Sequence, residues 1–115
     1  GALIMHMGSA AIIGQQKCDN FKHILFNNGC HDSVGGQPTV GYKINLQKIA
    51  KSMNYSLILE SMDLKSLKSN FKKLMQHKGS AFLEIKVKKG YRSNLGRPTT
   101  TPLENKKELM NFLKK

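Results

Sequence analysis

The chain has 115 residues, of which 39% are hydrophobic, so it is long enough for one domain with a modest core. No apolar run reaches the ~20 residues of a membrane-spanning helix, and the first residues do not resemble a signal peptide, so we predict a cytoplasmic protein with no membrane partner. The formal net charge is +12, yet only two of the 19 basic residues, Arg92 and Arg97, are arginines. Proteins that recognise a nucleic-acid sequence commonly contact the bases through arginine side chains, so we predict no nucleic-acid partner.

The first half of the chain alternates helical and strand patterns. Apolar residues at helical spacing predict a helix over residues 3–16, and the apolar run at residues 21–26 predicts a buried strand. A second helix is predicted over residues 45–53, where Asn45 can cap its first turn. Asn54 is a plausible stop for it, and a second strand is expected over the residues 55–59 that follow.

The second half continues the alternation. Residues 63–77 give the clearest helix, with Asp63 as its cap and lysines in its last turn, where the helix dipole favours cations. A third strand is predicted over residues 81–87, and its alternating end places it nearer an edge of the sheet. An irregular stretch then leads to a last helix over residues 103–113, opened by Thr101-Pro102.

Strands that alternate with helices of this length predict an α/β fold with a parallel sheet and flanking helices. We expect residues 1–115 to form a single domain. In such sheets, ligands bind in the loops at the carboxyl ends of the strands. The loop after the first predicted strand is therefore the first place to look for a binding site.

That loop reads NNGCHDSVGGQPT, residues 27–39. Its three glycines permit close backbone approach, and Asn27 and Asn28 offer neutral oxygen ligands. Mg²⁺ takes oxygen ligands and is usually shared with phosphates, so the loop could hold a metal that bridges a diphosphate. It could equally be a turn in which the asparagine side chains satisfy backbone groups. No Walker motif follows.

The loop resembles the end of the thiamine-diphosphate motif in the phosphonopyruvate decarboxylases. Two further stretches resemble the same family: MHMGSAAIIG at residues 5–14 and AFLEIKVKKGYRSNLGRPTTTPLENK at residues 81–106. The resemblance implies the C-terminal part of a pyrophosphate-type, thiamine-diphosphate-binding module, and a chain that is a fragment of a longer one. Gly1 stands where the motif has the last glycine of its GDG start, so the aspartate ligand of GDG would precede it.

The resemblance also implies roles for individual residues. Asn28 would bind Mg²⁺ through its side-chain oxygen, and Cys30 through its backbone carbonyl. Gly1 would lie beside the diphosphate, and Asn27 and Gly29 would complete the cofactor-binding turn. His31 and Asp32 are candidate catalytic residues, since they would face the substrate, where a histidine could move protons near neutral pH. The alternative is a loop histidine that is hydrogen-bonded by its neighbour Asp32.

Four further residues are candidates for binding the substrate. Ser33, Gln37 and Thr39 could donate hydrogen bonds to an oxyanion or a phosphonate, or they could close the loop on itself. Arg97 could bind a phosphonate dianion, because an arginine fork matches such a group. It could instead belong to a solvated basic tail.

The activity implied by the resemblance is decarboxylation of phosphonopyruvate to phosphonoacetaldehyde and CO₂, with thiamine diphosphate and Mg²⁺ as cofactors. An N-terminal module on the same or another chain would bind the aminopyrimidine, so we expect a homo-oligomer and no activity from this chain alone. Decarboxylation of sulfopyruvate or another 2-keto acid is the nearest alternative. A basic nucleic-acid-binding module and a non-catalytic partner subunit are alternatives of a different class.

Overall fold

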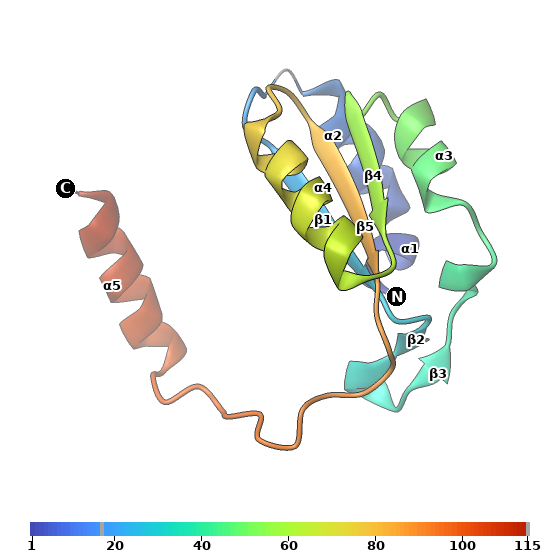
Figure 1. Cartoon of the computed structure of the whole chain (residues 1–115). Coiled ribbons are helices and arrows are strands. Elements are labelled where there is room, and N and C mark those ends of the chain that lie inside the picture. The colour runs from blue at the N-terminus through green and yellow to red at the C-terminus, as the bar shows by residue number, and fades with distance from the viewer. Residues whose placement is uncertain (17, 115) are drawn as a thin grey trace.

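The computed structural model describes residues 1–16 and 18–114 and has an α/β fold (Figure 1). Its central sheet has three parallel strands, β1 (Lys22–Asn27), β4 (Leu57–Ser61) and β5 (Ala81–Lys86), in the order β1-β5-β4. The parallel sheet expected from the alternation of helices and strands is therefore confirmed. Every strand points its carboxyl end toward the same edge of the sheet, where the loop at residues 27–39 begins.

The prediction that residues 81–87 lie nearer an edge of the sheet is wrong, because β5 is the central strand. It pairs with β1 and β4 at once, and Glu84 stands opposite Leu25 on one side and Glu60 on the other. Glu84 is only 2% exposed, so the polar residue that gave the strand its alternating pattern faces protein rather than water.

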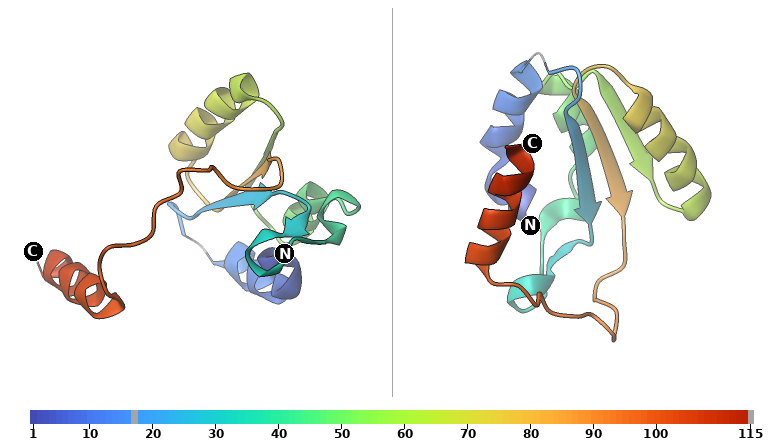
Figure 2. Two further views of the ribbon diagram at one scale, coloured as in Figure 1. Left: turned by 90° about the horizontal axis from the view of Figure 1, so that it is seen from below. Right: turned by 90° about the vertical axis from the view of Figure 1, so that its left-hand side faces the viewer.

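Helices cover both faces of the sheet, as Figure 2 shows. On one face lie α1 (Ala2–Met5), α2 (Met7–Gln15) and α3 (Leu46–Ser52), and on the other face lies α4 (Leu64–Gln76). Each face has its own hydrophobic cluster. The first includes Ala10, Leu46, Ala50, Tyr55 and Phe82, and the second includes Leu74, Ala81, Leu83 and Ile85.

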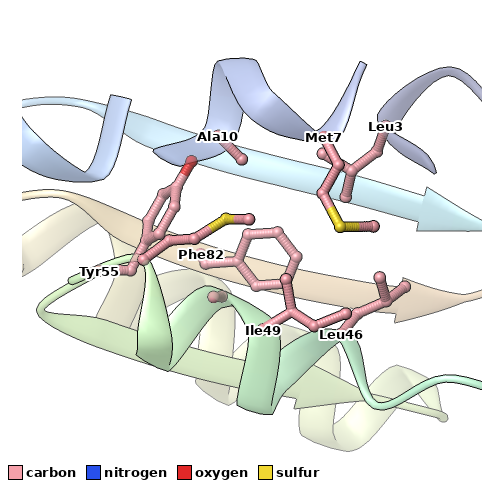
Figure 3. A pocket seen from close by; sticks show the side chains of 9 residues that line it. Leu3, Met7, Ala10, Leu46, Ile49, Tyr55 and Phe82 are labelled. Carbon is pink, nitrogen blue, oxygen red and sulfur yellow. The ribbon is translucent and has the colours of Figure 1, made fainter. Parts of the chain in front are cut away.

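The first cluster is closely packed (Figure 3). Side chains from α1 and α2 meet those of α3 over the ring of Phe82, and the cavity between them measures only about 10 Å³. This volume is close to the minimum that holds one water molecule. This cavity is therefore too small to hold a ligand, and the cluster around it supports the sheet.

Local signals fix most of the element boundaries. Asn45 caps α3 through Oδ1, which accepts the N–H of Lys48 at 2.7 Å, and Asp63 caps α4 in a capping box with Ser66. Asn54 follows α3 with φ of 66°, a left-handed conformation that ends helices. These caps and this stop were predicted.

The first helix and the second strand differ most from the predictions. The first helix is divided into α1 and α2 at His6, and β4 begins two residues later than expected, at Leu57. The shift of β4 has a physical reason. The strand starts at Leu57 because its partner strand β5 begins at Ala81, opposite Leu57, while Tyr55 packs into the first cluster. At the other end β4 continues to Ser61, which stands opposite Ile85.

The loop after β1 contains short elements that the sequence did not predict. They are β2 (Cys30–His31), the 3₁₀ turn η1 (Asp32–Val34), β3 (Gln37–Pro38) and the 3₁₀ turn η2 (Val40–Tyr42). Strands β2 and β3 pair antiparallel below the carboxyl ends of the sheet strands (Figure 1). The loop therefore has regular backbone structure of its own.

The last helix, α5 (Pro102–Leu113), lies apart from the sheet at the end of an extended segment (Figure 1). A capping box between Thr101 and Glu104 and the proline at its first position account for its start. None of its residues is buried. Within the described residues, no helix is long and apolar enough to cross a membrane.

Candidate functional site

The candidate site is the turn Asn27-Asn28-Gly29-Cys30 at the carboxyl end of β1. Asn27 is the last residue of β1, and Cys30 is the first residue of β2. The turn thus joins the central sheet to the β2–β3 unit. The structure brings seven of the predicted site residues together here: Gly1, Asn27, Asn28, Gly29, Cys30, His31 and Asp32.

The side chain of Asn27 is buried and fully engaged. Its Nδ2 donates to the carbonyl of Gly41 at 2.9 Å and to Oε1 of Glu84 at 2.7 Å. Its Oδ1 accepts the N–H of Gly29 at 3.1 Å. Because every polar atom of the amide has a partner, Asn27 holds the start of the turn against the sheet.

Asn28 repeats this arrangement closer to the surface. Its Nδ2 donates to Oδ2 of Asp32 at 2.8 Å, and its Oδ1 accepts the N–H of Cys30 at 3.2 Å. The carboxylate can only accept, so the amide must turn its NH₂ toward Asp32 and its oxygen toward Cys30. Oδ1 has a second lone pair, and its one hydrogen bond is long, so it can act as an oxygen ligand.

The carbonyl of Cys30 is a second candidate oxygen ligand. The carbonyls of residues 29 and 31, on either side of it, accept N–H groups from residues 39 and 36 at 2.8 Å each. Cys30 itself stands opposite Pro38 in the β2–β3 register, and proline has no N–H to donate. Within the described residues, no group of three or more His, Cys, Asp or Glu side chains could hold a metal. Besides the Asp32 carboxylate, which already accepts hydrogen bonds from Asn28 and Gly90, the loop offers amide and backbone oxygens as ligands.

Gly29 gives the turn its shape. Its φ is +70°, in the left-handed region, and a Cβ on it would collide with the ring of Tyr42. The hydroxyl of Tyr42 lies 3.2 Å from the carbonyl of Asn27 and 2.9 Å from that of Val87, toward which it donates. Tyr42 therefore covers the turn and joins the carboxyl ends of β1 and β5.

His31 packs against Gly1. A Cβ on Gly1 would overlap the imidazole at Nδ1 and Cε1, so only glycine allows this approach. The start of α1 and the loop after β1 are thus in direct contact, although thirty positions separate them in the sequence.

Asp32 is the charged centre of the loop. The N–H of Gly90 holds the pKa of its carboxyl below the usual range, and hydrogen bonds from the Cys30 thiol and the Asn28 amide act in the same direction. Burial, together with the neighbouring Asp32 carboxylate, raises the pKa of the Cys30 thiol. Asp32 is therefore an anion and Cys30 a neutral thiol around neutral pH.

The predicted substrate-binding residues are more scattered. Thr39 accepts the N–H of Gly41 at 3.1 Å through its hydroxyl, and Gln37 lies against Gly35, so both side chains help to close the loop. Ser33 is exposed in η1. Arg97 is exposed in the segment before α5, whereas Lys89, earlier in this segment, contacts the loop by donating to Gly36 O at 2.8 Å.

Sequence reasoning missed three residues that support the site: Tyr42, Gln47 and Glu84. Gln47 donates to the carboxylate oxygen of Glu84 that Asn27 leaves free. The one available signal was a glutamate within the apolar run AFLEIKV, on a strand that ends beside the loop. A charged residue in such a run is buried only when it has polar partners.

Comparison with known proteins gives a family for most of the chain. The sequence model of one protein family, described as thiamine pyrophosphate enzyme, C-terminal TPP binding domain, matches residues 1–85. The chain is also 30% identical to a phosphonopyruvate decarboxylase of Streptomyces viridochromogenes over 104 residues. These aligned residues make up 90% of this chain and 26% of that protein.

Two further relatives have a similar sequence identity to this chain. A phosphonopyruvate decarboxylase of Streptomyces hygroscopicus is 27% identical over 112 residues, 97% of this chain and 28% of that protein. The sulfopyruvate decarboxylase subunit beta of Methanothermobacter thermautotrophicus is 29% identical over 90 residues, 78% of this chain and 46% of that protein. The chain thus spans about a quarter of the length of the two phosphonopyruvate decarboxylases and about half of the subunit.

Proposed function

The chain belongs to the thiamine pyrophosphate enzyme family through its C-terminal cofactor-binding domain, and we propose that it holds the Mg²⁺ and the diphosphate in a 2-keto acid decarboxylase. The observation that carries this proposal is the turn after β1. There Asn28 Oδ1 and the Cys30 carbonyl are oxygen donors on a backbone that Asn27 fixes to the sheet.

The donor set suits magnesium. Mg²⁺ prefers oxygen ligands and is commonly bound by one or two protein groups together with phosphate oxygens. Two neutral protein oxygens are compatible with this pattern, because anionic ligands would come from the diphosphate and from the aspartate that the family resemblance places before Gly1. A zinc site would instead call for histidine or cysteine side chains, and the only cysteine in this turn is a buried, neutral thiol.

When bound, thiamine diphosphate supplies the electron sink for the electron pair that remains as CO₂ leaves. The residues of this chain position it and shape its surroundings. Asn28 and Cys30 would hold the metal, and Gly1 and Gly29 would allow the backbone to approach the diphosphate closely. Tyr42, packed over Gly29, would shield the turn from water on one side.

His31 is the candidate for proton transfer. It follows the metal-binding turn directly, and an imidazole can give or take a proton near neutral pH. Its contact with Gly1 would place the ring between the two segments expected to flank the diphosphate. We assign His31 to protonation at the reacting carbon or to orientation of the keto acid. Asp32 acts on the loop itself through its hydrogen bonds to Asn28 and Gly90.

Phosphonopyruvate is the proposed substrate, with phosphonoacetaldehyde and CO₂ as products. Two of the relatives are named phosphonopyruvate decarboxylase, and their alignments cover nearly the whole of this chain. Sulfopyruvate is the second candidate, because the sulfopyruvate decarboxylase subunit beta is similar at almost the same identity. Both substrates are 2-keto acids with an acidic group at the far end, for which Ser33, Gln37, Thr39 and Arg97 remain candidate ligands.

The remaining half of the cofactor site would come from elsewhere in the protein. The chain spans only part of its relatives, and one of them is named as a subunit. We propose that a pyrimidine-binding module, on the same or another chain, completes the site in a homo-oligomer.

The test is an assay of CO₂ release by the full-length protein that carries this chain. Phosphonopyruvate, sulfopyruvate and pyruvate are each supplied with and without Mg²⁺ and thiamine diphosphate. Turnover that needs both cofactors and is fastest with phosphonopyruvate supports the proposal, and a preference for sulfopyruvate selects the second candidate. A folded, cofactor-supplied protein that decarboxylates none of them contradicts it.

A further inference from the structure

One oxygen of Asp32 joins two distant parts of the chain. Its Oδ2 accepts Nδ2–H of Asn28 at 2.8 Å and the backbone N–H of Gly90 at 2.8 Å. Building on the proposed function, we propose that Asp32 is a positioning residue with two tasks. It fixes the amide of Asn28 for the metal ion, and it ties the C-terminal segment, residues 88–101, to the metal-binding turn.

The first task follows from the chemistry of an amide. Asn28 can bind a cation only through Oδ1, and a flipped amide would present its NH₂ group instead. A flip would also place Oδ1 beside the Asp32 carboxylate, where two acceptors repel, and would bring NH₂ against the N–H of Cys30. The carboxylate thus selects one of the two amide orientations before any metal arrives, as outer-shell partners of metal ligands commonly do.

The second task rests on three contacts of the chain that leaves β5. Val87 N–H donates to the carbonyl of Asn27 at 2.9 Å, Lys89 Nζ donates to the carbonyl of Gly36 at 2.8 Å, and Gly90 N–H donates to Asp32. Gly90 has φ of +107°, a conformation that side-chain-bearing residues rarely adopt. The segment is therefore held to the loop at successive points before it extends toward α5.

These two tasks use the same atom, so they should fail together. Without the carboxylate, the Asn28 amide would be free to turn, and the Gly90 N–H would lose its acceptor. The metal-binding turn and the C-terminal segment therefore behave as one unit, because Asp32 is hydrogen-bonded to both.

Two measurements on the full-length protein test this proposal. The first is the Mg²⁺ affinity at saturating thiamine diphosphate, measured by calorimetry. The second is amide hydrogen exchange over residues 88–95, measured without metal or cofactor. We expect Asp32→Ala to weaken Mg²⁺ binding by about 10- to 100-fold, the usual loss for an outer-shell partner, and to speed exchange in this segment.

Two control variants separate positioning from general damage. Asp32→Asn keeps an acceptor oxygen that both donors can use, so it should restore most of the slow exchange and part of the affinity. Asp19→Ala removes an exposed carboxylate from the turn before β1, at the opposite end of that strand, and should change neither quantity. If Asp32→Ala does not fold, Asp32→Asn carries the test, with an intermediate loss of affinity expected.

Wild-type Mg²⁺ affinity in a folded Asp32→Ala protein, or unchanged exchange over residues 88–95, would overturn the proposal and leave the proposed function standing. Failure of the wild-type protein itself to bind Mg²⁺ with thiamine diphosphate would contradict the proposed function. The metal part of this proposal would then fall with it.

Discussion

The amide of Asn27 and the carboxylate of Glu84 are joined across two neighbouring strands, Nδ2 to Oε1 at 2.7 Å. Both side chains are buried, at 6% and 2% exposure. Asn27 directly precedes Asn28, so the central strand β5 holds the turn after β1, the candidate metal site, through a buried polar link. Gln47 of α3 donates to the other oxygen of the same carboxylate, which brings a helix into the link.

Replacing Glu84 should therefore destabilise the fold and loosen the turn. Glu84→Leu leaves the buried Asn27 amide without one of its acceptors, and we expect the free energy of unfolding to fall by about 2–3 kcal/mol. Glu84→Gln should cost less, because Gln47 can turn its amide to accept. Denaturant unfolding of the full-length protein measures both effects.

The matched control is Glu60→Leu on the neighbouring strand. Glu60 forms a partly exposed ion pair with Lys86 at 2.6 Å, and such pairs contribute about 0–1 kcal/mol. An equal loss of stability in Glu60→Leu and Glu84→Leu would show that the buried link has no special role.

Gly29→Ala and Gly8→Ala should have opposite effects. At Gly29 the backbone is left-handed and Tyr42 occupies the space of a Cβ, so alanine should destabilise the protein by more than ~1 kcal/mol. Gly8 lies within α2 with nothing near its Cβ position, so alanine there should stabilise by about 0.5–1 kcal/mol. Thermal unfolding distinguishes them, and a neutral Gly29→Ala would argue against a fixed turn.

His31→Gln tests whether the histidine moves protons. If it does, turnover should fall by about 10²-fold or more, while Mg²⁺-dependent binding of thiamine diphosphate stays at the wild-type level. His77→Gln is the control, since His77 contacts Ser56 Oγ, far from the loop after β1. Wild-type turnover in His31→Gln would favour the alternative of a loop histidine without a catalytic role.

The cap of α4 should make stability depend on acid pH. A hydrogen bond from the backbone N–H of Ser66 holds the pKa of Asp63 below its ordinary value of 3.8, and the Ser66 hydroxyl lowers this pKa further. A carboxyl with a depressed pKa in the folded state stabilises the protein above its unfolded pKa, and this contribution is lost as pH falls through the folded value.

Asp63→Asn should remove this pH dependence. Asparagine can still accept the Ser66 N–H as a helix cap, but it does not titrate. We expect the difference in melting temperature between wild type and Asp63→Asn to shrink as pH falls from neutral to strongly acid. A constant difference across that range would show that the Asp63 carboxyl has the same pKa in both states.

The architecture could be predicted from sequence because it depends on repeated local signals. Apolar runs and helical spacing indicated the order of the elements, and short polar caps such as Asn45 and Asp63 marked the starts of two helices. Errors arose where a distant contact overrides a local pattern. Glu84 suggested an exposed edge, whereas its partners Asn27 and Gln47, far away in sequence, make it a central, buried residue.

The turn after β1 was predictable in its location and only partly in its contacts, and its role in cofactor binding stays a prediction. Two asparagines and a glycine after a buried strand indicated the turn, and the family resemblance supplied roles for them. The hydrogen bond from Gly90 to Asp32 spans 58 positions, and no periodic pattern encodes it. The same holds for Tyr42, which packs on Gly29 through the fold of the loop.

Calorimetry of thiamine diphosphate binding tests most directly whether the turn at Asn28 binds the metal of the cofactor. The full-length wild-type protein, Asn28→Ala and the control Asn20→Ala, in the turn before β1, are titrated with and without Mg²⁺. If the turn binds the metal, thiamine diphosphate binds in a Mg²⁺-dependent way to wild type and Asn20→Ala, and a folded Asn28→Ala loses most of this affinity. Binding by Asn28→Ala with the wild-type affinity and the same dependence on Mg²⁺ would contradict metal binding by this turn.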